Sequence, residues 1–217
     1  MCYDKDMNNP RQIIISVFVL VIVGLGIFFL TTKKENSTTL PGLTQSEVPP
    51  PPDQIVYPID RANERVTKKT FGTHVSPGNS PVSPERFTGY HTGVDFEAFP
   101  EEANSDVPIY AICDGKIAKK ETARGYGGML VQSCTLDNQP VVVVYGHVSL
   151  KSIAKNIGDI LVISEKIGNL GQPPGETDGE RKHLHLGIHK GTSMNTSGYV
   201  ATQAQLSGWL DPRNFIK

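Results

Sequence analysis

The chain has 217 residues, with 21 Lys and Arg against 22 Asp and Glu, and its formal net charge is −1. That balance provides no basic surface, so we expect no nucleic-acid partner. The 21 glycines and 16 prolines favour a turn-rich β domain, and the three cysteines contain no Cys-x-x-Cys pair that would indicate a thiolate zinc site.

A short tail at residues 1–12 precedes an uncharged apolar run at residues 13–30, IIISVFVLVIVGLGIFFL. As a helix this run is about 27 Å long, close to the ~30 Å hydrocarbon core of a bilayer. The sequence TTKKENSTT follows it, in place of the small-residue site at which a signal peptide is cleaved. We therefore predict a single-pass transmembrane anchor, although the basic residues flank it almost equally and leave its orientation open.

Residues 31–54 are rich in Thr, Ser and Pro and end in VPPPPDQ. Four consecutive prolines favour an extended polyproline II spacer. We interpret this segment as a linker between the membrane and one domain at residues 55–217.

From residue 55 onward, short apolar runs alternate with turn signals, which is typical of β-strands. The predicted strands are residues 94–99, 107–113, 116–122, 128–134, 140–148, 160–163, 166–171 and 183–190. Turns are expected at Asp114-Gly115, at residues 125–128 and at Asp137-Asn138, and a short helix at residues 149–156. The domain is therefore predicted to be mainly β and antiparallel.

Cys113 and Cys134 fall near the ends of adjacent predicted strands. A disulfide between them and two separate buried thiols are both compatible with the sequence, because a bridge requires a Cα separation that sequence does not give.

The segment ERKHLHLGIHK at residues 180–190 carries histidines on alternate positions. In a strand, successive side chains point to opposite faces, so the apolar and imidazole side chains separate. The residues expected in the core are Leu184, Leu186 and Ile188. His183 and His185 lie about 7 Å apart on the other face and can share one metal, whereas His189 is a further ~13 Å along the strand and too distant.

Two further segments carry histidines, GYHTGVDF with His91 and Asp95, and VVVVYGHVSL with His147. Imidazole nitrogen and carboxylate oxygen are both zinc ligands, and a catalytic zinc needs three protein ligands and one open position. Taken singly, each segment also has a plain structural explanation, a surface hydrogen bond or a satisfied histidine at a strand end. His74 and His189 are expected to be exposed or locally hydrogen-bonded.

Together these segments resemble the lysostaphin-type (LytM-type) zinc metalloendopeptidases of peptidoglycan. GYHTGVDF is similar to the family's H-x-G-x-D block, YGHVS to its Y-x-H-L block, and HLHLGI to its H-L-H-F block. FGTHVSP, VPIYAICDGKIAKK and GYGGMLVQ also resemble family motifs, so that the resemblance extends over residues 56–216. It implies antiparallel sheets forming a grooved lysostaphin-like (duplicated hybrid motif) peptidase domain.

Carried over position by position, the resemblance implies that His91, Asp95 and His185 bind one zinc ion. His147 and His183 would be the unligated catalytic pair, and which of them is the base stays open. The implied activity is hydrolysis of peptide bonds in peptidoglycan cross-links or stem peptides, by a membrane protein whose domain lies outside the cytoplasmic membrane.

Two alternatives accompany this interpretation. Some relatives are non-catalytic scaffolds that activate another wall hydrolase, and these have typically lost zinc ligands, whereas all five positions are intact here. A phosphocarrier domain has a related β fold, but it is cytoplasmic and needs no aspartate ligand.

The sequence departs from the family pattern in two segments. The loop QPPGETDGER at residues 172–181 replaces a short Gly/Ser/Thr-rich connection, and residues 191–209 form an insertion after the last predicted strand. We expect the loop to border the groove and to affect substrate preference.

Overall fold

The computed structural model describes residues 57–216. The predicted N-terminal tail, transmembrane anchor at residues 13–30 and linker at residues 31–54 lie outside the described residues and stay predictions. Within residues 57–216, no helix combines the length and the apolar character needed to cross a bilayer.

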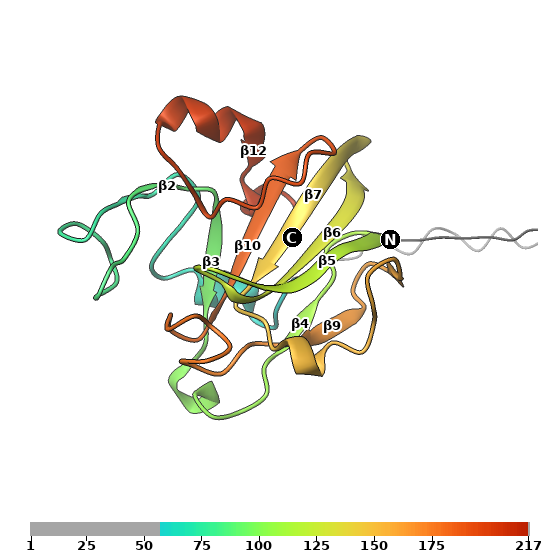
Figure 1. Ribbon diagram of the computed structural model, residues 1–217, viewed down its shortest axis with the longest axis horizontal. Coiled ribbons are helices and arrows are strands. Elements are labelled where there is room, and N and C mark those ends of the chain that lie inside the picture. The colour runs from blue at the N-terminus through green and yellow to red at the C-terminus, as the bar shows by residue number, and fades with distance from the viewer. Residues whose placement is uncertain (1–56, 217) are drawn as a thin grey trace, which may run out of the picture. The chain divides into compact units, whose positions relative to one another are not determined.

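The largest element is a seven-stranded antiparallel sheet (Figure 1), in which β10 pairs with β7 on one side and with β3 and β12 on the other. The order is β12-β10-β7-β6-β5-β8, and β3 also pairs with β10. The strand bounds are β3 (Gly93–Glu97), β5 (Gly115–Ala123), β6 (Gly127–Leu136), β7 (Gln139–Gly146), β8 (Ile160–Leu161), β10 (His183–Lys190) and β12 (Trp209–Leu210).

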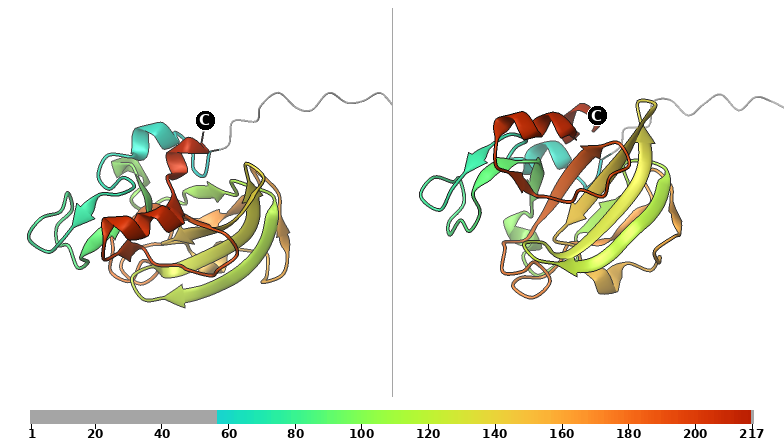
Figure 2. Two further views of the ribbon diagram at one scale, coloured as in Figure 1. Left: turned by 90° about the horizontal axis from the view of Figure 1, so that it is seen from above. Right: turned by 45° about the horizontal axis from the view of Figure 1, so that its top comes forward.

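Two smaller sheets complete the β structure, and Figure 2 shows them beside the twisted main sheet. One contains β1 (His74–Val75), β2 (Gly89–His91) and β11 (Tyr199–Val200), and the other contains β4 (Pro108–Tyr110) and β9 (Lys166–Asn169). The helical segments are short: α1 (Ala62–Arg65), η1 (Pro100–Glu102), η2 (Leu150–Ser152), η3 (Gln203–Gly208) and η4 (Pro212–Asn214).

All eight predicted strands are present within a few residues of their predicted bounds, and every strand pair is antiparallel. The predicted helix at residues 149–156 is reduced to the 3-10 segment η2. Four strands were not predicted, β1, β2, β11 and β12, because runs of two or three residues are too short to show a period.

The turn predictions had different outcomes. Asp137 and Asn138 have φ values of 47° and 60°, and they connect β6 to β7 as a two-residue hairpin loop. Asp114-Gly115 does not close a hairpin, because β4 pairs with β9 while β5 pairs with β6 and β8. The chain bends there to pass from the small sheet to the large one.

The alternating pattern of β10 separates its side chains as predicted. Leu184, Leu186 and Ile188 are fully buried in the main core. Full burial of such side chains contributes about 1.5–3 kcal/mol each. Their neighbours on the adjacent strands are also buried core residues, Val94 and Phe96 of β3 and Val143 and Tyr145 of β7.

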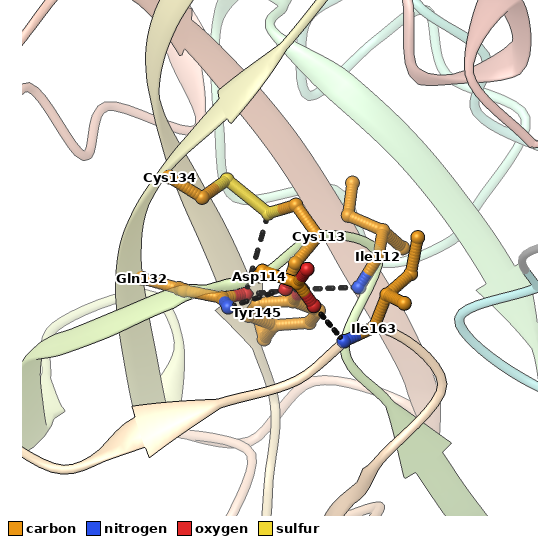
Figure 3. The surroundings of a disulfide bond; sticks show 7 residues. All are labelled: Ile112, Cys113, Asp114, Gln132, Cys134, Tyr145 and Ile163. Atoms are coloured by element: carbon orange, nitrogen blue, oxygen red, sulfur yellow. Dashed lines mark hydrogen bonds between the residues drawn. A yellow bond between two sulfur atoms is a disulfide. The ribbon is translucent and has the colours of Figure 1, made fainter. Parts of the chain in front are cut away.

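Cys113 and Cys134 form a disulfide with a Cα separation of 6.2 Å (Figure 3), which decides between the two alternatives left open by the sequence. It joins the segment before β5 to β6. Beside it, the amide of Gln132 donates to the Cys113 carbonyl at 2.8 Å, and the hydroxyl of Tyr145 donates to Gln132 Oε1 at 3.0 Å. Closing a loop of this length stabilises the fold by about 3 kcal/mol in the chain-entropy treatment.

Candidate metal centre

The pairing of β10 with β3 and β7 brings the distant motifs together. In the register of these strands, His185 lies opposite Asp95 on one side and opposite Gly146 on the other. His91 ends β2, two residues before β3 begins, and His147 directly follows β7. The imidazole face of β10 is therefore flanked by all the other predicted site residues.

His91, Asp95 and His185 direct three donor atoms at one point. His91 Nε2 lies 3.0 Å from His185 Nδ1 and 3.2 Å from Asp95 Oδ1, and His185 Nδ1 lies 3.2 Å from the same oxygen. Ligands at 2.0–2.1 Å from a tetrahedral zinc are about 3.3 Å apart. The spacing and chemistry of this donor set thus fit a zinc ion.

The contacts of the other ring nitrogens, those of His91 and His185 that are not among the three donors, also fit zinc binding. His91 Nδ1 lies 3.2 Å from the Thr70 carbonyl, which can only accept, so the proton is on Nδ1 and the Nε2 lone pair faces the other donors. His185 Nε2 lies 3.5 Å from the hydroxyl of Tyr126, which itself donates to the Thr196 carbonyl at 3.0 Å. Metal-bound histidines usually have such outer partners, which fix the ring orientation.

Burial and neighbouring charge keep the donors in their metal-binding forms. Burial lowers the pKa of His185 to about 4, so this ring is neutral at pH 7. Burial opposes ionisation of Asp95, but the surrounding imidazoles outweigh it and hold the pKa of its carboxyl well below the ordinary value. A carboxylate and an unprotonated imidazole are the species that bind a metal.

The second oxygen of Asp95 contacts Arg181, which the sequence analysis did not identify. Arg181 Nη2 donates to Asp95 Oδ2 at 2.8 Å, and the guanidinium also binds Glu97. The available signal was the alternation itself, since residue 181 precedes His183 by two positions, as His183 precedes His185. The basic character of residue 181, in the loop that replaces a Gly/Ser/Thr-rich connection, did not by itself indicate a contact with Asp95.

His147 and His183 lie together beside the three donors, with ring centroids 4.2 Å apart. His183 Nδ1 donates to the Arg181 carbonyl at 2.9 Å, which leaves Nε2 unprotonated in the neutral ring. His147 has φ 60°, and within residues 57–216 its buried Nδ1 finds no hydrogen-bond partner. Burial, followed by the positive charge that His183 carries when it is protonated, lowers the pKa of His147 well below the ordinary value, so His147 is neutral at pH 7.

A pocket of about 220 Å³ opens above these residues. Glu180 and Arg181 of the 172–181 loop line it, as predicted, and the turn between β5 and β6 contributes Tyr126. The insertion at residues 191–209 also lines it, because β11 pairs with β2 and Tyr199 lies opposite His91. The Tyr199 ring stacks on Phe87 with centroids 5.2 Å apart.

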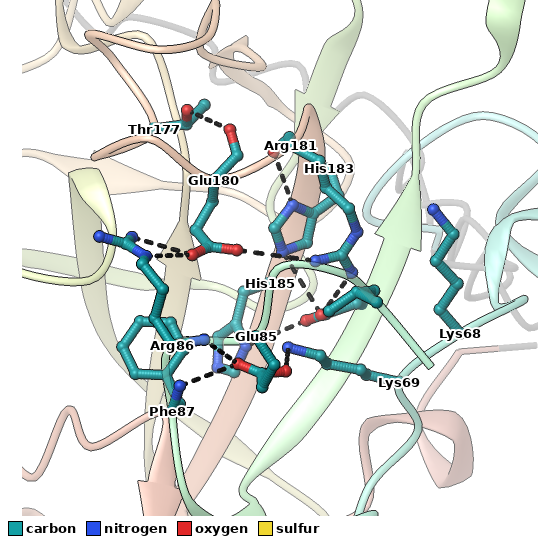
Figure 4. Close-up of polar contacts among 12 residues, drawn as sticks. Lys68, Lys69, Glu85, Arg86, Phe87, Thr177, Glu180, Arg181, His183 and His185 are labelled. Carbon is teal, nitrogen blue, oxygen red and sulfur yellow. Dashed lines mark hydrogen bonds and ion pairs between the residues drawn. The ribbon is translucent and has the colours of Figure 1, made fainter. Parts of the chain in front are cut away.

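A buried ion pair supports the Tyr199 side of this pocket (Figure 4). Lys69 Nζ lies 2.6 Å from Glu85 Oε2, and each side chain is 1% exposed. Lys69 Nζ also donates to the Tyr199 hydroxyl at 2.8 Å. Burial opposes ionisation of Glu85, but hydrogen bonds from Lys69 and Ser80 lower the pKa of Glu85 below its ordinary value.

The remaining two histidines lie away from the pocket. His74 is exposed and packs edge-on against Tyr90 at 4.7 Å between ring centroids. His189 packs against Trp209 at 4.9 Å. Neither lines the pocket. His74 is exposed as expected, whereas His189 is half-buried and its Nδ1 has no hydrogen-bond partner within residues 57–216.

Residues 89–196 match the family profile described as Peptidase family M23, and this range contains His91, Asp95, His147, His183 and His185. No curated protein matches the chain.

Among solved structures, the catalytic domain of the antimicrobial peptidase lysostaphin from Staphylococcus simulans is 22% identical, over 71% of this chain and 96% of that chain, with a TM-score of 0.47. The structure of LytU is 23% identical over 70% of this chain and 83% of that one, with a TM-score of 0.46. Csd3 from Helicobacter pylori is 20% identical over 70% of this chain and 32% of that one, with a TM-score of 0.42.

Proposed function

Residues 89–196 form a domain of peptidase family M23, and from this premise we propose that the chain is a zinc-dependent endopeptidase that hydrolyses peptide bonds in peptidoglycan cross-links or stem peptides. The observation that carries the proposal is the donor set of His91, Asp95 and His185, with mutual distances of 3.0–3.2 Å beside an open pocket. The peptidoglycan substrate follows from the motif resemblance described above.

In the proposed mechanism, His91, Asp95 and His185 hold one zinc, which when bound supplies Lewis-acid polarisation of the scissile carbonyl. In the neutral ring of His183, Nδ1 donates to the Arg181 carbonyl, and Nε2, which lies 3.4 Å from Asp95 Oδ2, would accept the proton of the attacking water. His147 is neutral and buried next to it, where its ring can donate a hydrogen bond to the developing oxyanion.

The principal alternative is a non-catalytic scaffold that activates another wall hydrolase. Loss of ligands is the feature expected of such a scaffold. Here the three donors and both additional imidazoles are intact, and a pocket gives access to them. These features favour catalysis.

We further propose that the domain lies on the outer side of the cytoplasmic membrane, held by the predicted helix at residues 13–30. The Cys113–Cys134 disulfide supports this location, because such bonds persist in oxidising compartments and are rare in the cytosol.

The test is digestion of purified cell walls that differ in cross-link type by the full-length chain in mild detergent. One set of samples carries one zinc equivalent and the other is stripped by a chelator. We expect new peptide amino termini, identified by mass, in the zinc-loaded samples alone, and their return when zinc is restored. Zinc binding without cleavage of any wall would favour the scaffold, and absence of zinc binding would exclude a metallopeptidase.

A further inference from the structure

The proposed mechanism uses the backbone carbonyl of Arg181 but not its guanidinium. The guanidinium lies between two carboxylates of β3, those of Asp95 and Glu97, and contacts both. Nη2 donates to Asp95 Oδ2 at 2.8 Å, and Nε donates to Glu97 Oε2 at 2.8 Å. Only 19% of the side chain is exposed. A largely buried cation held by two carboxylates has a fixed geometry.

This contact divides the two oxygens of Asp95 between different partners. Oδ1 faces His91 Nε2 and His185 Nδ1, whereas Oδ2 faces Arg181 at 2.8 Å and, at 3.4 Å, His183 Nε2. The terminal torsion of an aspartate is broad, so a carboxylate without such a partner can rotate. With Oδ2 bound to Arg181, Oδ1 stays directed at the other two donors.

The same guanidinium also separates two like charges. Asp95 and Glu97 are two positions apart on β3 and point to the same face of the strand. Both are buried, so their mutual repulsion is stronger than it would be in water. Arg181 relieves that repulsion and holds the Asp95 carboxylate directed at the imidazoles.

We propose that Arg181 is a positioning residue of the metal centre, which presents Asp95 as a single-oxygen ligand and is itself oriented by Glu97. The inference rests on the zinc site of the proposed function. From charge alone, Arg181 should weaken metal binding, because a nearby cation repels a divalent metal ion. The positioning role predicts the opposite. A positioning role means that removal of Arg181 weakens metal binding, whereas a mere charge effect means that removal strengthens it.

The experiment is a titration of the full-length apoprotein with Zn²⁺ in competition with a chromophoric chelator. Arg181→Met removes the guanidinium and keeps much of the apolar side chain. We expect its zinc affinity to fall about 10- to 100-fold, as is typical when an outer partner of a metal ligand is lost. Arg181→Lys should recover part of this loss, because an ammonium can pair with one carboxylate but not hold both.

Arg86→Met is the matched control. Arg86 also borders this region and binds Glu180, but none of its hydrogen bonds or ion pairs within the described residues involves Asp95 or Glu97. The Arg86→Met variant loses the same charge as Arg181→Met, but its zinc affinity should stay within about twofold of the wild type. Circular dichroism of each variant establishes that it folds.

Glu97→Gln tests the second part of the inference. Alone it should weaken zinc binding by a smaller factor than Arg181→Met. In the Arg181→Met background it should cause no further loss of zinc affinity, because Glu97 supports the site only through Arg181 and its repulsion of Asp95 is then removed. The absorption bands of Co²⁺ in the same variants report changes in coordination independently of hydrolysis.

The possible results are distinct. Unchanged or tighter zinc binding by Arg181→Met overturns the positioning role while leaving the zinc site in place. Unchanged affinity together with a raised KM for wall peptide makes Arg181 a substrate contact, which also overturns it. Failure of the wild type to bind zinc overturns both this inference and the proposed function.

Discussion

The two halves of β10 carry the same alternating pattern, yet they have different environments. Residues 183–187 pair with β3, and residues 185–187 pair with β7 as well, whereas residues 188 and 189 lie between β12 and β7. His185 is therefore opposite Asp95, and His189 is opposite Trp209. The period of a strand assigns a side chain to a face, but the strand on the neighbouring side determines what chemistry that face can perform.

The difference is visible in the partners of each ring. His185 lies within 3.2 Å of a carboxylate oxygen and another imidazole nitrogen. His189 packs its ring against an indole, and the candidate metal cluster found among residues 57–216 does not include it. Four substitutions or conditions test this contrast.

The largest effect is expected for His185→Ala in the first half of β10. Removal of one of three donors should abolish stoichiometric zinc binding. The loss of zinc affinity should exceed the ~100-fold expected when an outer hydrogen-bond partner of a ligand is removed. Wall hydrolysis should disappear with it. Metal analysis of the purified protein and release of peptide amino groups measure the two effects, and retention of both by this variant would contradict the ligand assignment.

His147→Asn should separate catalysis from metal binding. Asparagine tolerates the left-handed backbone of this position, where φ is 60°, but its shorter side chain cannot place a hydrogen-bond donor where the imidazole ring does. Turnover should fall by about 10²–10³-fold, the usual cost of removing one donor to the oxyanion, while one zinc stays bound. Loss of zinc from this variant would show that His147 is a ligand.

Acidification of the metal-free protein should destabilise it through His185. The pKa of this ring is about 4 in the folded protein against an ordinary value of 6.5. Between these pH values the unfolded chain binds more protons than the folded one, so the free energy of unfolding decreases as the pH falls from 6.5 to 4. The decrease from this group is about 3 kcal/mol.

Urea unfolding of the wild type and of His185→Ala, followed by circular dichroism across this range, measures the effect. The variant should lose part of the slope. Burial also lowers the pKa of His147 and, at the other end of β10, of His189, so some slope in the same direction remains. An equal slope in both proteins would be inconsistent with a buried neutral His185.

The smallest effect is expected for His189→Ala. This substitution removes an aromatic contact with Trp209 that contributes about 0.5–1.5 kcal/mol. Zinc content and turnover should stay within twofold of the wild type, since the residue lies outside the pocket. A variant without zinc would mean that the second half of β10 takes part in the site.

The long strands could be predicted because alternation over five or more residues identifies both the strand and its buried face, as in β10. From the residues alone, the sequence also supported a shared face for His183 and His185. The grouping of His91 and Asp95 with them depended on the motif resemblance, because spacing within a strand carries no information about which other strand lies beside it.

What sequence did not predict depends on contacts between loops. Lys69 and Tyr199 are separated by 130 residues and meet through a hydrogen bond. Arg181 contacts Asp95 across 86 positions. Neither contact has a local pattern, and the short strand β11, which brings Tyr199 to the pocket, has only two residues.

The backbone of residues 69 and 70 holds both ends of the His91–Asp95 motif. The Lys69 carbonyl accepts from the Asp95 amide at 3.0 Å, and the Thr70 carbonyl accepts from His91 Nδ1 at 3.2 Å. Both carbonyls lie upstream of residue 89, where the family match begins. A recombinant fragment or chimaera cut to that match would carry all three proposed ligands and still lack the carbonyl that sets the His91 tautomer. Gene boundaries should therefore include residue 69 and extend beyond Tyr199.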